Sequence, residues 1–220
     1  VTAERIYTAK KQAVEEVLQR GRIPLLVDPD GRAIEVLKPD VVVDAIIAKK
    51  NLGTYKEMAP LVIGIGPGFV AGKDVHLVVE SMRGHNLARI LETGSALANT
   101  GIPGNIGGYT KERVIHAAAE GYMKNLHQIG DVVQKGEEIA RIYEQMSPDG
   151  VFSGRFVSVE ATIPGVLRGL IREGYHFQKG FKIADIDPRE SELANCFTIS
   201  DKASSIGGSV LEAVCRYVNG

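Results

Sequence analysis

The sequence predicts a fold in two parts, an α/β region followed by a mainly-β region that ends in a helix. Three observations predict this class. Short apolar runs interleave with a helical pattern near the start, residues 117–142 are repeated at 161–186, and an apolar helical stripe covers 203–218. The predicted segments are an α/β region at 1–72, a β-hairpin and glycine-rich connection at 73–110, a β domain at 111–188, and a C-terminal segment with a helix at 189–220.

The first segment has the pattern of a parallel sheet. Apolar positions over 3–19 recur at helical spacing, and Gly21 is placed to end that helix. The runs 23–27, 41–47 and 61–65 are almost continuously apolar, which favours strands buried on both faces. Because helical and strand patterns interleave, we expect part of a Rossmann-like α/β unit.

The β domain predicted at 111–188 carries an internal duplication at an offset of 44 residues. Three of the matches are glycines at turn positions, where chance similarity rarely stays in register. The identical pairs are Ala117/Ala161, Gly121/Gly165, Leu126/Leu170, Gly130/Gly174, Gln134/Gln178, Lys135/Lys179, Gly136/Gly180, Ile139/Ile183, Ala140/Ala184 and Ile142/Ile186.

Each copy reads as short strands separated by glycine turns. In this respect 129–140 and 160–171 resemble the two half-motifs of a biotinyl/lipoyl-type barrel-sandwich hybrid. Carriers of that type hold their prosthetic group on a lysine between the halves, and the connection 143–157 contains no lysine. We therefore expect no covalent biotin or lipoate, and a scaffold or docking surface instead.

Composition restricts the class of partner. The formal net charge is −1 and tryptophan is absent, which argues against nucleic acid and anionic membranes as partners. No apolar run is long enough to span a bilayer. Two cysteines without a secretory leader indicate a cytoplasmic protein with free thiols, and without a CxxC pair we expect no structural metal.

A glycine loop follows the run at 61–65. Gly66 and Gly68 could present backbone amides to a phosphate. Pro67 removes one donor and a strand pattern follows in place of a helix, so a simple tight turn is the alternative.

Polar residues also follow the strand at 41–47. Asp44, Lys49, Lys50, Asn51 and Thr54 cluster where the ligands of open α/β sheets gather. The lysine pair suits a phosphorylated ligand, and a solvated loop is the alternative.

A third cluster follows Gly68. Asp74, His76 and Glu80 share one side of an expected strand, with Arg83 and His85 on the adjoining turn. A histidine beside carboxylates could shuttle protons or bind a metal, but without a third clear ligand we predict anion binding through Arg83 and no metal. A solvated strand face with internal ion pairs is the alternative.

The loop 99–104 offers donors from Asn99 and Thr100, in a ligand-binding or a structural role. We expect these clusters to line a cleft between the α/β part and the β part.

Cys196 is the candidate reactive group. It precedes Lys202 near the start of the last predicted helix, where a thiol could act as a nucleophile or sulfur acceptor. A small buried side chain is the alternative.

Several stretches together resemble the YqeB family of selenium-dependent molybdenum hydroxylase system proteins. They run in order along nearly the whole chain. The matching stretches are 43–54, 66–76, 80–85, 99–104, 168–172, 185–189 and 200–203.

The resemblance implies an accessory or maturation factor whose partner is a molybdenum hydroxylase. The expected ligand is a small phosphorylated cofactor such as molybdopterin or its dinucleotide form. No motif specifies a reaction, so a stand-alone enzyme is not the preferred interpretation. The alternatives are a nucleotide-dependent oxidoreductase, a sulfur/selenium transferase using Cys196, and a docking module; a homo-oligomer stays open.

Overall fold

The computed structural model describes residues 2–101 and 104–220, which divide into two compact units. Unit 1 comprises Val1–Asn99 together with Asp201–Gly220, and unit 2 comprises Thr100–Ser200. The last helix therefore belongs to the same unit as the first half of the chain.

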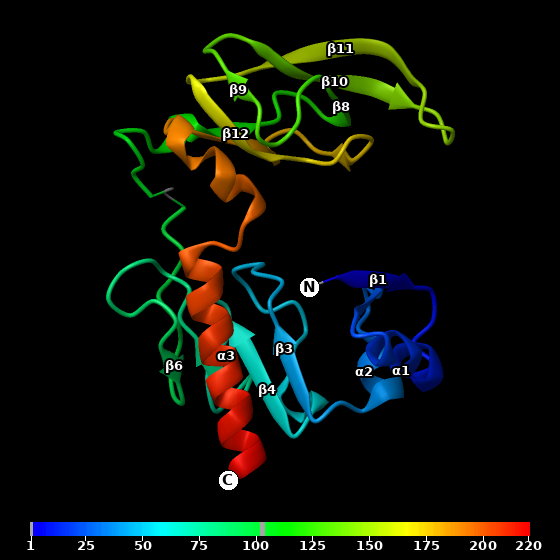
Figure 1. Ribbon diagram of the computed structural model, residues 1–220, viewed down its shortest axis with the longest axis vertical. Helices are drawn as coiled ribbons and strands as arrows, with labels where there is room; N and C mark the ends of the chain where they lie inside the picture. The colour runs from blue at the N-terminus through cyan, green and yellow to red at the C-terminus, as the bar shows by residue number, and fades with distance from the viewer. Residues whose placement is uncertain (1, 102–103) are drawn as a thin grey trace. The chain divides into compact units, whose positions relative to one another are not determined.

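The described residues of unit 1 form two sheets and three α-helices. Figure 1 shows how these elements follow one another along the chain. Its strands are β1 (Ala3–Ile6), β2 (Ile23–Leu26), β3 (Val41–Asp44), β4 (Leu61–Ile65), β5 (Leu77–Val79) and β6 (Ile90–Leu91). Its helices are α1 (Lys11–Gln19), α2 (Arg32–Leu37), the 3-10 helix η1 (Lys56–Met58) and α3 (Asp201–Asn219). The main sheet has the order β3-β4-β5-β6, and its first three strands are parallel while β6 is antiparallel.

Apolar side chains cover both faces of this main sheet. Every residue of β4 is buried, as its continuously apolar sequence requires. The apolar stripe of α3, centred on Ala213, packs against Ile63 of β4 and Val79 of β5 on one face, and Figure 1 shows α3 beside β4. Phe69 and Val75 belong to the cluster on the other face. No helix in the described part of the chain is both long and apolar enough to cross a bilayer.

The partial Rossmann-like sheet is not what forms. β2 pairs only with β1, in a separate two-stranded parallel sheet, and does not join β3 and β4. The connection from β4 to β5 contains no helix, so these parallel strands lack the helical crossover of a doubly wound sheet. Apolar runs predicted the strands, but they do not specify which strands pair.

Unit 2 is a mainly-β unit. Its strands are β7 (Val114–His116), β8 (Gly121–Asn125), β9 (Val132–Val133), β10 (Glu138–Met146), β11 (Phe152–Glu160), β12 (Gly165–Leu170), β13 (His176–Phe177) and β14 (Lys182–Asp187). Two 3-10 helices flank them, η2 (Lys111–Arg113) and η3 (Glu190–Phe197). The strands form two antiparallel four-stranded sheets, ordered β11-β10-β8-β13 and β7-β14-β12-β9.

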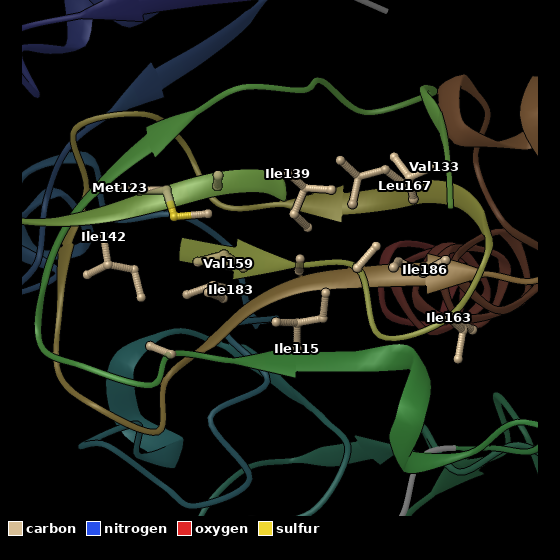
Figure 2. Packing of buried hydrophobic residues seen from close by; sticks show 14 of the residues in the cluster. Ile115, Met123, Val133, Ile139, Ile142, Val159, Ile163, Leu167, Ile183 and Ile186 are labelled. Carbon is tan, nitrogen blue, oxygen red and sulfur yellow. The ribbon is translucent and has the colours of Figure 1, made fainter. Parts of the chain in front are cut away.

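The 44-residue repeat of the sequence corresponds to a repeat of strands. β8, β9 and β10 of the first copy begin 44 residues before β12, β13 and β14 of the second. The short strand of each copy joins the sheet formed by the longer strands of the other copy. β9 of the first copy pairs with β12 of the second, and β13 of the second pairs with β8 of the first. Side chains of both copies, among them Met123, Ile139, Leu167 and Ile183, form one buried core (Figure 2).

The predicted fold class is therefore wrong. Residues 2–101 and 104–220 form four separate multi-stranded sheets, mostly antiparallel, and a C-terminal helix, in place of a Rossmann-like sheet joined to a biotinyl/lipoyl barrel-sandwich hybrid. The repeat identifies equivalent strands and turns, whereas sheet membership depends on contacts between residues distant in the sequence, which a local pattern does not encode.

Candidate functional site

The carboxyl ends of β3, β4 and β5 lie at one edge of the main sheet, because these three strands are parallel. We call residues 44–54, 66–68 and 80–83, which follow the three strands, the carboxyl rim. Ligands of open α/β sheets bind at such edges. Most of the predicted site residues of unit 1 lie on this rim.

The loop after β3 is organised by Asp44. Its buried carboxylate accepts hydrogen bonds from the Ile46 amide at 3.1 Å and from the Thr54 hydroxyl at 2.6 Å. The Asn51 side chain closes the loop, since its oxygen accepts from the Gly53 and Thr54 amides and its nitrogen donates to the Thr54 carbonyl. These polar groups are occupied in building the loop.

The same loop presents two cations. Lys49 and Lys50 are exposed and form no ion pair with any described residue. Ile47 and Lys49 hold left-handed backbone conformations, with φ of 59° and 63°. This backbone conformation is energetically unfavourable for residues other than glycine, and strained residues of this kind cluster at binding sites.

The glycines after β4 join the neighbouring loops. Gly68, with φ +116°, packs so closely on the first loop that a Cβ there would lie 2.7 Å from the Lys50 Cα. Gly66, with φ +79°, lies against Ser81, whose hydroxyl would be 2.5 Å from an added Cβ. Only glycine fits these two positions, and the loop 66–68 is therefore in contact with each of the other two loops of the rim.

Glu80, which follows β5, is a structural anchor of the rim. Its buried carboxylate accepts the Met82 amide at 2.6 Å and the Leu97 amide at 2.8 Å. Both oxygens thus fix the backbone on either side of β6.

Arg83 completes the rim and is held by α3. Its Nη1 and Nη2 donate to Asp201 Oδ2 and Oδ1 at 2.7 and 2.9 Å, and this pairing raises the pKa of Arg83. Asp201 is the first residue of α3, so the helix that covers the sheet also positions this guanidinium.

His76 lies apart from the rim. It precedes β5, at the amino edge of the sheet, and its Nδ1 accepts the Val62 amide at 3.0 Å. Burial, followed by the nearby Lys56 ammonium, lowers its pKa. Asp74 accepts from the Val70 amide. β5 is only three residues long, so the expected strand face shared by Asp74, His76 and Glu80 does not form.

The remaining predicted residues are dispersed. His85 is exposed on the turn before β6. Asn99 ends one stretch of unit 1 and Thr100 begins unit 2. In the predicted loop 99–104, residues 102 and 103 lie outside the described residues. Cys196 is half-buried in η3 of unit 2, whereas Lys202 and α3 belong to unit 1.

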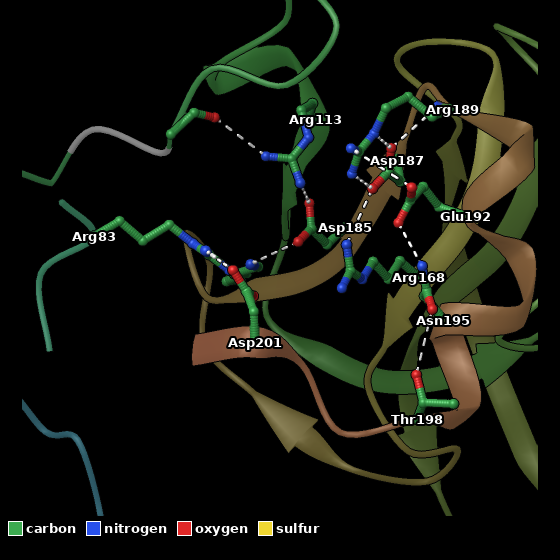
Figure 3. A network of polar contacts seen from close by, with 12 residues as sticks. Arg83, Arg113, Arg168, Asp185, Asp187, Arg189, Glu192, Asn195, Thr198 and Asp201 are labelled. Carbon is green, nitrogen blue, oxygen red and sulfur yellow. Dashed lines mark hydrogen bonds and ion pairs between the residues drawn. The ribbon is translucent and has the colours of Figure 1, made fainter. Parts of the chain in front are cut away.

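Sequence reasoning missed a polar network in unit 2 (Figure 3). Asp187, 1% exposed, accepts from the Arg189 amide, Nε and Nη2 and from Arg168 Nη1, all within 3.1 Å. Arg189 is the main cause that lowers the pKa of Asp187 to about 2. Beside it, buried Arg113 pairs with Asp185 at 3.2 Å. Two aspartates two residues apart in a buried strand, followed by Arg189, were the available signal.

A cavity of about 650 Å3 lies at the amino edge of the main sheet, lined by residues that include Lys38, Asp40, Tyr55 and Glu57. It contains none of the predicted site residues. Among the residues that the structure describes, no group of three histidine, cysteine or acidic side chains is arranged to hold a metal ion.

Comparison with known proteins shows extensive sequence similarity to a curated protein. No family model matches the chain. The chain is 47% identical over 219 residues to "Uncharacterized protein YqeB" of Escherichia coli K12, and this match covers 100% of the chain. The chain spans 38% of the length of that relative.

Similarity to solved structures is partial. An aspartoacylase family protein from Mesorhizobium loti has a TM-score of 0.31 and 11% identity, covering 46% of this chain and 29% of that protein. The ectoine utilization protein EutE from Ruegeria pomeroyi has a TM-score of 0.27 and 16% identity, with coverages of 45% and 28%. A succinylglutamate desuccinylase from Silicibacter has a TM-score of 0.26, 16% identity and coverages of 58% and 45%. TM-scores this low do not establish a shared overall fold.

Proposed function

We propose that this chain, whose 47% identity over its whole length supports membership of the YqeB family, binds a phosphate-bearing ligand at the carboxyl rim. The main observation that supports this proposal is the pair of exposed lysines, Lys49 and Lys50. Their ammonium groups have no ion-pair partner among the described residues, and the loop that bears them packs on Gly68. Unpaired cations at the carboxyl ends of parallel strands suit a phosphate group.

The other charges of the rim are compatible with this ligand. Asp44 and Glu80 are buried, and their oxygens accept hydrogen bonds from groups of the chain itself. Both carboxylates are therefore solvated by hydrogen bonds within the loops, and among the described residues neither forms an ion pair with Lys49 or Lys50.

The ligand we propose is molybdopterin or its dinucleotide form, and the role is that of an accessory factor for a selenium-dependent molybdenum hydroxylase. The family resemblance implies this role, and a phosphorylated cofactor fits the cations of the rim. Lys49 and Lys50 would hold its phosphate. The cofactor supplies the redox chemistry of the hydroxylase, and the rim supplies binding and orientation.

Calorimetry with pyrophosphate as the probe tests the site. The double variant Lys49→Ala/Lys50→Ala should bind pyrophosphate at least about tenfold more weakly, since two charge-assisted contacts are lost. Lys135→Ala/Lys179→Ala is the matched control, because it removes the same charge from two exposed lysines at equivalent repeat positions in unit 2. If the two double variants bound pyrophosphate with equal affinity, the carboxyl rim would not be the binding site.

Native mass spectrometry tests the identity of the ligand. Protein purified from a molybdenum- and selenium-replete host should retain the mass of molybdopterin or its dinucleotide form, and the rim variant should not. Loss of the gene should lower hydroxylase activity in that host. Full hydroxylase activity without the gene would refute the accessory role.

A further inference from the structure

The pair Arg83–Asp201 has the geometry of a ligand contact. The guanidinium donates from both terminal nitrogens to both carboxylate oxygens, which is also how arginine binds a phosphate. The side chains are 58% and 71% exposed. Because exposed ion pairs contribute little to stability, holding the fold together is not a sufficient account of this one.

Arg83 belongs to the same rim as the proposed phosphate contacts, and packing between neighbouring loops connects the two. The loop of Lys50 packs on Gly68, Gly66 packs on Ser81, and Arg83 follows Ser81 by two residues. A cation on the same rim as the lysine pair would normally contribute to binding the same anion. In this structure both terminal nitrogens of Arg83 donate to Asp201.

We propose that Asp201 occupies the position that a phosphate of the ligand takes on Arg83, and that it thereby selects dianionic phosphate groups over carboxylates. The proposal rests on the proposed function of the carboxyl rim. A carboxylate ligand would replace Asp201 with a group of the same charge and geometry, and would gain nothing. A phosphate dianion carries more charge and a third oxygen for Lys49 or Lys50, so it can displace Asp201.

Asp201→Asn tests the selection without removing the side chain. Asparagine keeps the size of the residue and the polar side chain at the start of α3, and it lacks the charge that holds Arg83. We expect its affinity for pyrophosphate to rise roughly 1.5- to fivefold, the range that an exposed ion pair spans. Acetate, which should not bind the unmodified chain measurably, should become a competitor of pyrophosphate.

Two further variants make the outcome specific. Asp149→Asn removes one exposed carboxylate from a turn of unit 2 and should leave pyrophosphate affinity unchanged. In an Arg83→Lys background, Asp201→Asn should raise the affinity for pyrophosphate less, because lysine cannot make the bidentate contact. Circular dichroism verifies that each variant is folded.

The outcomes separate the two proposals. If the unmodified chain binds pyrophosphate and Asp201→Asn changes neither this affinity nor acetate competition, the selection by Asp201 is wrong and the site stands. An equal gain from Asp149→Asn would reduce the effect to net charge and overturn the selection. If neither the unmodified chain nor Asp201→Asn binds pyrophosphate, both proposals fail.

Discussion

The two copies of the repeat in unit 2 share a close contact between a glycine and a backbone carbonyl. They differ in the side chain of the residue that carries this carbonyl. Gly121 and Gly165 lie 44 residues apart with φ of +155° and +147°, and each lies against the carbonyl oxygen of the residue 22 positions later, Tyr143 or Asp187. Tyr143 contacts the ring of Phe152 with centroids 5.5 Å apart, whereas Asp187 is a buried carboxylate.

A second equivalent pair follows the same division. Lys124 lies 5.2 Å from the centre of the Phe152 ring and pairs with Glu173 at 3.2 Å. Its counterpart, Arg168, pairs with Asp187 at 3.1 Å. Burying a charge is costly unless it is paired, so the second copy depends on its arginines where the first depends on ring contacts. Duplication preserved the close backbone contacts and left the side chains free to diverge.

The largest effect should come from the shared glycines. An alanine Cβ at Gly121 or Gly165 would collide with the backbone carbonyl of Tyr143 or Asp187, which cannot move without shifting a strand. We expect each substitution to lower the free energy of unfolding by about 3 kcal/mol or more. Urea unfolding followed by circular dichroism measures the loss, and hydrogen exchange locates it within unit 2.

Two other glycines of the repeat provide the matched control. Gly136 and Gly180 have φ of +83° and +86° and open space around an added Cβ. Alanine there incurs only the left-handed backbone cost, about 1–2 kcal/mol. Equal losses at all four positions would show that backbone conformation, and not the close contact, constrains the repeat.

Asp187 should produce the next largest effect, and it distinguishes the copies. Asp187→Asn leaves two arginines without their shared counter-charge and should cost about 2–4 kcal/mol at neutral pH. Tyr143→Leu at the equivalent position keeps an apolar side chain and should cost about 1–2 kcal/mol. A smaller loss for Asp187→Asn than for Tyr143→Leu would contradict the dependence on the ion network.

The pH dependence of stability tests the same carboxylate. Its pKa is lowered from 3.8 to about 2 in the fold, so its stabilisation is present above pH 3.8 and is lost as the pH falls toward 2. The shift corresponds to about 2 kcal/mol. The unfolding free energy of Asp187→Asn should therefore decline less over this acid range than that of the unmodified chain.

The repeat was predictable because glycine turns leave a local signature. Gly130 and Gly136 fix the ends of short strands, and their counterparts recur in register. The exchange of β9 and β13 between sheets was not predictable, because a strand of two residues has no periodicity that specifies its neighbour. The architecture of unit 2 was therefore misassigned although its strands were recognised.

The rim shows the same division between local and distant information. Asp44, Asn51 and Thr54 are close in the sequence, and the structure joins them by hydrogen bonds. The partner of Arg83 lies 118 residues away at the start of α3, which no spacing rule reveals. Asp187 was overlooked because a buried carboxylate is visible only once Arg168 is placed beside it.

The smallest expected effect concerns Arg168 and Lys124, the cations at equivalent positions of the two copies. It tests whether the contact of Arg168 with Asp187 accounts for the difference between the copies. Arg168→Met should cost about 1–2 kcal/mol, because it removes one donor from a fully buried carboxylate that Arg189 still binds. Lys124→Met should cost under about 1 kcal/mol, since Lys124 and Glu173 are 40% and 46% exposed. In an Asp187→Asn background the cost of Arg168→Met should largely vanish, while that of Lys124→Met should persist. The costs of Arg168→Met and Asp187→Asn could instead prove additive in the double variant. Arg168 would then stabilise the strand by packing, and the charge of Asp187 would not explain why the two copies differ.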